Sequence, residues 1–180
     1  MIYDIINETD VKYHEKAETY MISLIFDHPA QVSDLLLQKD TFDGYIVGNI
    51  LMTAKLSFVL ENTEENVKVP YKEIRPLVSS FASTADGSDP DHPFLMSLQK
   101  ARITLHAPQS YQNSLLASAD EQSTADLVRS LVLTFRWEND TLTALTGISY
   151  SAFTTDKSAE RLWDQAIQKA FDHLGIPYTH

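Results

Sequence analysis

The chain contains no cysteine, which excludes disulfide frameworks, thiolate metal centres and a cysteine nucleophile. It has only 5 glycines in 180 residues, too few for the glycine-rich loops that hold phosphate groups against backbone amides. Positive charge is also scarce, because 14 Lys and Arg stand against 25 Asp and Glu, for a formal net charge of -11. Nucleic-acid binding needs clustered cations, so we expect no nucleic-acid partner.

Long apolar runs are absent as well. The longest one, Tyr20 to Phe26, covers seven residues, whereas a membrane-spanning helix needs about 20. The first ten residues, MIYDIINETD, lack the basic and apolar parts of a secretory signal. We therefore expect a cytoplasmic protein with no membrane partner.

The composition is that of a globular protein, with 43% hydrophobic and 22% charged residues. Residues 1–18 are polar and acidic, and they are predicted to form an N-terminal extension. Residues 19–180 show regular hydrophobic patterns without a linker or a repeat. They are predicted to form a single α+β domain.

Two kinds of periodicity define the expected elements. Alternating residues predict strands over 19–26, 42–52, 54–61, 98–107, 127–137 and 141–150. Helical stripes predict helices over about 30–39, 71–82, 110–118 and 156–174. The order of these elements predicts a mostly antiparallel sheet with three to four helices and a long C-terminal helix packed on the sheet.

The C-terminal helix has the clearest pattern. Its apolar stripe comprises Ala159, Leu162, Trp163, Ala166, Ile167, Ala170, Phe171 and Leu174. Thr155 or Asp156 is expected to cap its start, and Gly175 follows its expected end. In the helix over 71–82, Pro76 is tolerated only near the start, so that helix is expected to begin near Lys72 or Glu73.

Several segments resemble an uncharacterised bacterial family, a domain of unknown function found mainly in Firmicutes. The matching residues are Thr41-Phe42-Asp43, the helix from Val69-Pro70 to Phe81 with Arg75-Pro76 inside it, Thr146-Gly147-Ile148-Ser149, Phe153, Asp156 and Trp163-Asp164. This TGxS, F, D and WD pattern implies no activity, substrate or catalytic residue.

A second likeness concerns only the order of elements, which is similar to one module of a sliding DNA clamp. Clamps line their DNA-facing helices with cations, whereas the helix over 30–39 offers only Lys39. The helix over 71–82 offers only Lys72 and Arg75. Phosphate contacts require more positive charge than this, so the clamp is a remote alternative.

The loop at 84–93 holds the densest group of candidate ligands for a hard metal ion: Asp86, Asp89, Asp91 and His92. The spacing fits no calcium-binding loop, and two prolines restrict how the carboxylates can converge. We therefore favour a solvated loop and predict no metal site.

Two patterns suggest catalysis more weakly. Ser97 and Lys100 match the S-x-x-K motif, but residues three apart in a strand face opposite sides, which favours chance. His106 could serve as a general base, yet its place on the polar face of a strand favours an ordinary surface histidine. The sequence thus predicts no catalytic residue.

The polar residues that carry the resemblance are the remaining candidates for a ligand site: Thr146, Gly147, Ser149, Asp156 and Asp164. Small hydroxyls at a strand end beside a helix start could hold an anion or another small ligand. The alternative is structural: Gly147 would permit close packing, Asp156 would cap the last helix, and Asp164 would bond a strand or a loop.

The sequence favours a non-enzymatic binding or interaction module with a protein partner and no cofactor. The alternative is a small-ligand-binding protein or enzyme with a pocket near residues 146–156. The pattern does not define an oligomeric state.

Overall fold

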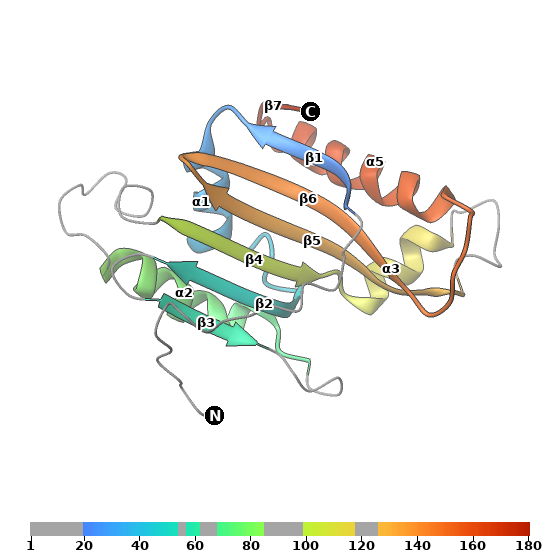
Figure 1. Ribbon diagram of the computed structural model, residues 1–180, viewed down its shortest axis with the longest axis horizontal. Coiled ribbons are helices and arrows are strands. Elements are labelled where there is room, and N and C mark those ends of the chain that lie inside the picture. Colours follow the sequence, from blue (N-terminus) through green and yellow to red (C-terminus); the bar gives the residue numbers. More distant parts are fainter. Residues whose placement is uncertain (1–19, 54–56, 62–67, 85–98, 118–125) are drawn as a thin grey trace.

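The computed structural model describes residues 20–53, 57–61, 68–84, 99–117 and 126–180. Their helices and strands are β1 (Tyr20–Phe26), α1 (Pro29–Leu37), β2 (Ile46–Thr53), β3 (Ser57–Glu61), α2 (Tyr71–Thr84), β4 (Lys100–His106), α3 (Gln109–Leu116), β5 (Val128–Glu138), β6 (Thr141–Tyr150), α5 (Ser158–His173) and β7 (Tyr178–Thr179). The strands form one sheet in the order β3-β2-β4-β5-β6-β1-β7. All four of these helices lie behind the sheet in Figure 1, so the predicted α+β fold is confirmed.

The hairpin of β5 and β6 forms the middle of the sheet, and every pairing in the sheet is antiparallel. Its turn is tight, because Glu138 pairs directly with Thr141. Asn139 and Asp140 both have positive φ, at 51° and 58°. Two such residues in a two-residue loop match the twist of the strands, and Asn and Asp tolerate this conformation. The predicted hairpin is therefore confirmed.

The hydrophobic core lies between the sheet and the helices. Its strand residues include Leu24, Phe26, Val47, Ile50, Met52, Ala101, Ile103, Leu105, Leu131, Leu133, Phe135, Trp137, Leu142 and Ala144. On α5, every fourth residue is buried, namely Ala159, Trp163, Ile167 and Phe171. Burying each large side chain stabilises the fold by about 1.5–3 kcal/mol.

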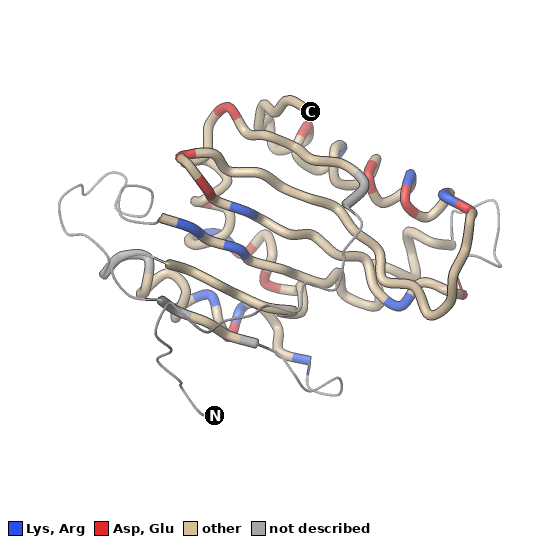
Figure 2. The backbone as a smooth tube through the Cα atoms, in the orientation of Figure 1, with Lys and Arg blue, Asp and Glu red and all other residues tan. Residues whose placement is uncertain are grey.

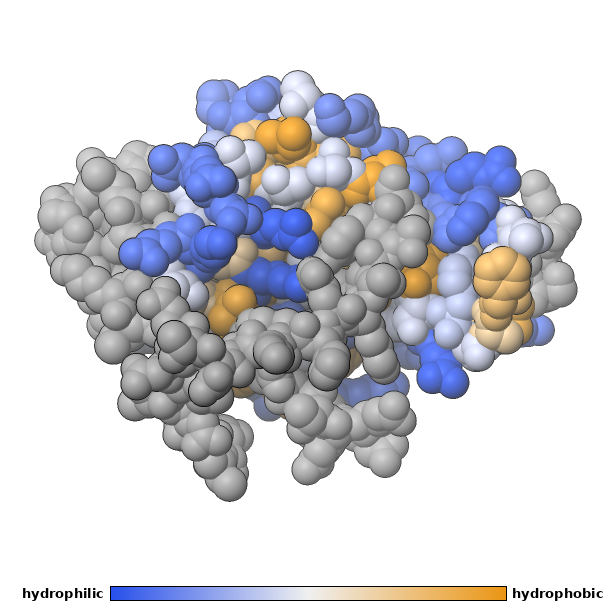
Figure 3. All heavy atoms as spheres, in the orientation of Figure 1, coloured by the Kyte–Doolittle hydropathy of each residue, from blue (hydrophilic) through white to orange (hydrophobic). Residues whose placement is uncertain are grey.

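The opposite face of the sheet is polar at its centre. Thr104 and Thr134 face each other across β4 and β5, with their Oγ1 atoms 3.3 Å apart. Arg102 lies opposite Arg136 two residues further along the same strands. Figure 2 shows positive residues on the central strands of the sheet, and Figure 3 shows hydrophilic side chains over the middle of this face.

The predicted strand over 42–52 is wrong at its beginning. The amide of Asp43 donates to the carbonyl of Asp40 at 3.0 Å, and the amide of Tyr45 donates to that of Phe42 at 2.9 Å. These are turn bonds, and β2 begins only at Ile46. The apolar residues of 42–45 imitate a strand because they pack inward from a turn.

A bulge in β2 also changes the predicted faces. The register against β4 shifts between Val47 and Asn49, so Val47 joins Ile50 on the core side rather than opposing it. At the bulge, a Cβ on Gly48 would lie 2.5 Å from Nε2 of His106. Glycine is thus the residue that lets the imidazole lie against β2.

Side chains of α2 satisfy carbonyls at the end of α1. The donors are spaced four apart and therefore share one face of the helix. Tyr71 Oη donates to Leu36 O at 3.1 Å, Ser79 Oγ to Leu37 O at 2.8 Å and Arg75 Nη1 to Lys39 O at 2.8 Å. These carbonyls would otherwise lack partners at the helix end.

Arg75 also binds a carboxylate. Its Nη2 donates to Oδ2 of Asp43 at 3.0 Å, and its Nε lies 2.9 Å from Oδ1. Both side chains are about a quarter exposed, at 23% and 24%. This two-point contact fixes the turn that precedes β2 to α2.

The position of Pro76 differs from the prediction. α2 begins at Tyr71, so Pro76 is the sixth helical residue and lies in the second turn rather than the first. The carbonyl of Lys72 therefore lacks its usual helical donor. Lys72 is exposed, so water can hydrate that carbonyl at little cost.

The end of α5 follows the prediction. Gly175 has a φ of 67°, and its amide donates to Asp172 O at 3.0 Å. The amide of Ile176 donates to Phe171 O at 3.1 Å, which completes a Schellman motif. The chain then adds β7 to the edge of β1, a strand the sequence did not predict.

Within the described residues, no helix combines the length and the apolarity needed to cross a bilayer.

We predict that Arg75→Lys lowers the free energy of unfolding by about 1–2 kcal/mol, because an ammonium cannot bind both Asp43 oxygens and the Lys39 carbonyl together. Chemical denaturation measures the effect. Lys72→Arg, at an exposed position of the same helix, is the control and should change stability by less than about 0.5 kcal/mol. Equal denaturation midpoints for Arg75→Lys and wild type would contradict this account.

Candidate functional site

A cavity of about 380 Å³ opens on the helix side of the sheet. It is lined by Thr41, Phe42, Gly44, Tyr45, Pro108, Tyr111, Leu133, Ile167, Ala170, Phe171 and Leu174. Its volume lies in the range of small-molecule sites, which are concave and mostly apolar. The cavity is thus lined by the 41–45 turn, the start of α3 and the end of α5, which are far apart in the sequence, together with Leu133 of β5.

Local structure explains why these segments meet. The turn over 41–45 is held by its own backbone bonds and by Tyr71, whose amide donates to Tyr45 O at 2.7 Å. α3 starts after Pro108 and is tied to the sheet by Gln112, whose Nε2 donates to Val128 O at 3.2 Å. Gln112 is itself buried. The walls of the cavity are therefore fixed by bonds outside it.

The rings in the cavity wall are held by other rings. Phe42 packs edge-on against Tyr45 at 5.5 Å and against Phe135 at 5.1 Å between ring centroids. Tyr111 meets Trp163 edge-on at 6.2 Å. Such edge-to-face pairs are favourable and leave the rings little freedom.

Tyr45 has a strongly perturbed hydroxyl. Burial raises the pKa of Tyr45 far above its ordinary value, and the nearby phenol of Tyr111 raises it further. The hydroxyl therefore stays protonated at any physiological pH and remains a hydrogen-bond donor. Unlike the Tyr150 hydroxyl, which is buried without a partner, the Tyr45 and Tyr111 hydroxyls are not among the buried, unpartnered polar atoms of the described residues.

The sequence-predicted candidates divide into separate places. Thr146 points to the helix side, where its Oγ1 donates to Asp164 Oδ1 at 2.6 Å. The same Oγ1 accepts the amide of Ile22 at 3.2 Å. The register of β1 against β6 shifts between Tyr20 and Ser23, so this amide lies in the irregular stretch. Thr146 and Asp164 therefore link β1, β6 and α5.

Asp164 is half-buried and titrates abnormally. Burial raises its pKa above the ordinary value, the hydrogen bond from Thr146 lowers it, and the charge of Glu160 raises it again. Burial dominates, so the protonated form is favoured more than in the unfolded chain.

Gly147 and Ser149 lie on the other face of the sheet, because alternate residues of β6 face opposite sides. A Cβ on Gly147 would meet Val132 Cβ at 3.7 Å, an ordinary contact. The expectation that Gly147 permits close packing is therefore wrong. Ser149 is exposed, so these two residues do not share a site with Thr146.

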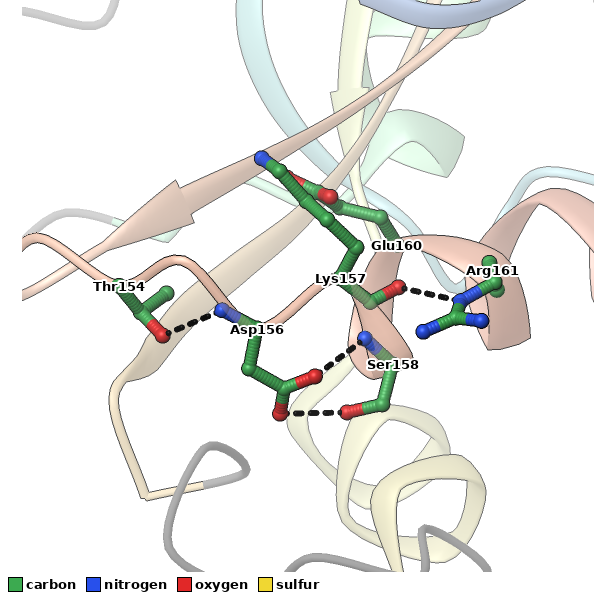
Figure 4. Close-up of polar contacts among 6 residues, drawn as sticks. All are labelled: Thr154, Asp156, Lys157, Ser158, Glu160 and Arg161. Carbon is green, nitrogen blue, oxygen red and sulfur yellow. Dashed lines mark hydrogen bonds and ion pairs between the residues drawn. The ribbon is translucent and has the colours of Figure 1, made fainter.

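Asp156 lies at the start of α5 (Figure 4). Its Oδ1 accepts the amide of Ser158 at 2.9 Å, and its Oδ2 accepts the Ser158 hydroxyl at 2.8 Å. The amide of Asp156 is bound in turn by Thr154 Oγ1 at 3.1 Å. These bonds hold Ser158, the first residue of α5. The N-cap position itself is Lys157, whose side chain makes no cap bond, so the prediction that Thr155 or Asp156 caps this helix is wrong in position.

The remaining candidates contribute no assembled site. The Asp86 to His92 cluster and Ser97 lie outside the described residues. His106 lies on the polar face of the sheet, where its Nδ1 is 2.6 Å from Ser130 Oγ. Over the described ranges, no group of three or more His, Asp or Glu side chains could hold a metal ion.

Sequence reasoning missed the cavity. Eight of its lining residues are apolar or glycine, and these were expected to fill the core or a strand. The only local signal was the group of rings at Phe42, Tyr45 and Tyr111, which lies in a turn and a short helix.

Comparison with known proteins gives one match. The model of DUF5721, a family of unknown function, matches residues 35–179. The chain belongs to this family. The resemblance to a family of unknown function is thus confirmed, while bacterial origin and the motif stay predictions. No curated protein matches this DUF5721 member, and no solved structure matches it either.

For Asp164 we predict a pH effect. Its raised native pKa means that the folded state binds more protons than the unfolded state, so its contribution to stability is lost as pH rises through the native pKa. Asp164→Asn has no titrating group at this position, so it does not lose this stability as the pH rises. Its amide oxygen can still accept the hydrogen bond from the Thr146 hydroxyl. The variant should therefore gain stability relative to wild type as pH increases from about 4 to 7.

Denaturation curves at several pH values measure this gain. Asp126→Asn removes the same charge at an exposed position before β5 and serves as the control. A relative stability of Asp164→Asn that does not change with pH would contradict the assignment of the titration to Asp164.

Asp156→Ala should lower the free energy of unfolding by about 0.5–1.5 kcal/mol, because the amide and the hydroxyl of Ser158 lose their acceptor. Asp156→Asn should retain most of the stability, since the amide oxygen still accepts from Ser158. Thermal unfolding compares the two variants. Equal losses of stability in the two variants would show that the charge of the Asp156 carboxylate, rather than its hydrogen bonds to Ser158, supports the start of α5.

Proposed function

We propose that this DUF5721 protein binds a small, mostly apolar molecule in the cavity between the 41–45 turn, α3 and α5, and does not transform it chemically. The observation that carries the proposal is the cavity itself, which is about 380 Å³ and walled by rings and aliphatic side chains. It is a half-open hollow at the surface rather than a sealed void, so a ligand can reach it directly from solvent.

The cavity walls favour a ligand because they are already in place. Phe171 packs edge-on against Phe26 at 4.8 Å. Leu133 and Phe171 are almost fully buried, so they form the floor of the cavity, while Thr41, Tyr111 and Leu174 are exposed at its sides. A wall that is fixed before binding does not have to be ordered by the ligand, which preserves affinity.

An enzyme centred on residues 146–156 has less support. Thr146 and Asp164 bond to each other, and Asp156 bonds to Ser158. Each of these bonds supports the position of α5, and none of the three residues lines the cavity. Their geometry favours structural roles.

Among the described residues, the interaction-module hypothesis has only scattered exposed hydrophobic side chains to support it, six in number, of which Phe153 is the most exposed. Phe153, in the connection from β6 to α5, is 90% exposed. One exposed ring is common on protein surfaces and identifies no partner. The DNA-clamp alternative gains no support, because α1 contains no Lys or Arg and Arg75 of α2 is paired with Asp43. The cytoplasmic location and a protein partner stay predictions.

A cavity-blocking variant tests the proposal. Ala170 is an exposed residue at the rim, and Ala170→Phe places a ring in the hollow without removing any packed side chain. We expect neutral apolar compounds to raise the melting temperature of the wild type, by an amount equivalent to about 2.7 kcal/mol at 100 times Kd. The same compounds should have no effect on Ala170→Phe.

Gln165→Phe is the matched control, since it adds the same ring at an exposed position of α5 that is not part of the cavity. It should respond to compounds like the wild type. The proposal fails if no compound binds the wild type, or if Ala170→Phe binds as well as Gln165→Phe.

A further inference from the structure

We infer that the ligand is an uncharged aromatic compound with an oxygen atom that accepts a hydrogen bond from Tyr45, which makes Tyr45 the residue that determines specificity. This inference rests on the proposed function. It concerns the chemical class of the ligand rather than the existence of the site.

The residues that line the cavity determine which charge the ligand can carry. None of the lining residues carries a charge. An ionised ligand would lose its hydration without gaining a counter-ion, which costs several kcal/mol. Phosphate and carboxylate compounds are therefore disfavoured, and a neutral molecule fits.

The aromatic rings in the cavity wall favour a ligand of a particular shape. Four of the lining side chains are aromatic: Phe42, Tyr45, Tyr111 and Phe171. Phe42, Tyr111 and Phe171 are each locked by a ring that lies outside the cavity, namely Phe135, Trp163 and Phe26. Phe42 and Phe171 are almost fully buried, so a planar ring in the cavity would lie over their edges and against the more exposed rings of Tyr45 and Tyr111.

The two tyrosine hydroxyls of the cavity wall are the reason to expect an oxygen atom in the ligand. Tyr45 is mostly buried and lines the cavity, so a purely hydrocarbon ligand would cover its hydroxyl without replacing the lost water. Tyr111 is 42% exposed, and water can still reach its hydroxyl at the rim. The difference in burial predicts that Tyr45 discriminates between ligands and that Tyr111 does so much less.

Two probes that share a skeleton test the inference. 1-Indanone has a carbonyl that accepts hydrogen bonds, and indane lacks it. The ratio of their affinities is measured by calorimetry or NMR titration for the wild type and for Tyr45→Phe. We expect the preference for indanone over indane to fall about three- to tenfold in Tyr45→Phe, the effect of one hydrogen bond.

The controls separate the ligand class from the site. Tyr111→Phe makes the same atomic change at the rim and should alter the ratio less than twofold, within about 0.4 kcal/mol. Indane-2-carboxylate should bind at least about tenfold more weakly than 1-indanone. Tyr45→Phe should fold normally, because the ring keeps its contact with Phe42.

Each outcome decides something. An unchanged ratio in Tyr45→Phe, or a carboxylate that binds as tightly as the ketone, overturns the ligand class while binding to the cavity stands. Binding of both probes that survives Ala170→Phe overturns the proposed function instead. If neither probe binds the wild type at about 1 mM while other neutral apolar compounds do, the ligand class is overturned and the proposed binding in the cavity stands.

Discussion

The contact on which the rest of the structure depends is the position of Trp163 between α5 and the sheet. Its side chain is fully buried, and its indole Nε1 donates to Val132 O at 2.8 Å. The ring removes a large apolar area from water, while the bond leaves no polar atom unsatisfied. Both the rotation and the height of α5 over β5 are thereby set. Ile167 and Phe171 then lie in the cavity wall, one and two turns further along the same face.

Much of the fold could be predicted from local pattern. The helix around Trp163 and the hairpin ending at Asn139 combine a long periodic stripe with matching end signals, so packing and local preference agree. The turn over 42–45 could not be predicted, because its apolar residues pack inward from a turn and alternation cannot distinguish that from a strand. The bulge at Gly48 lies against the imidazole of His106 on another strand, and such a long-range contact cannot be read from local pattern.

The candidate site was predictable to a smaller degree. Sequence reasoning selects polar residues at strand ends and helix starts, and Thr146, Asp156 and Asp164 satisfy that criterion. Their polarity serves the fold: an irregular stretch of β1 leaves the Ile22 amide to be satisfied, and Ser158 at the start of α5 needs an acceptor for its amide. The functional and the structural interpretation use the same residue types, so only the partners of each oxygen can separate them.

The cavity shows the opposite difficulty. A cavity forms where side chains leave a space unfilled, and no residue type in the sequence indicates where this happens. Gly44 and Ala170 leave room, while Phe42 and Phe171 supply apolar wall, yet each is an ordinary core or surface residue when read alone. Tyr45 differs from the other wall residues, because it carries a hydroxyl on a mostly buried ring. Its oxygen is not among the buried polar atoms that lack a partner, so water reaches it until a ligand covers it, and the ligand must then supply the replacement bond. This inference requires the three-dimensional arrangement, and it gives the site a chemical preference as well as a volume.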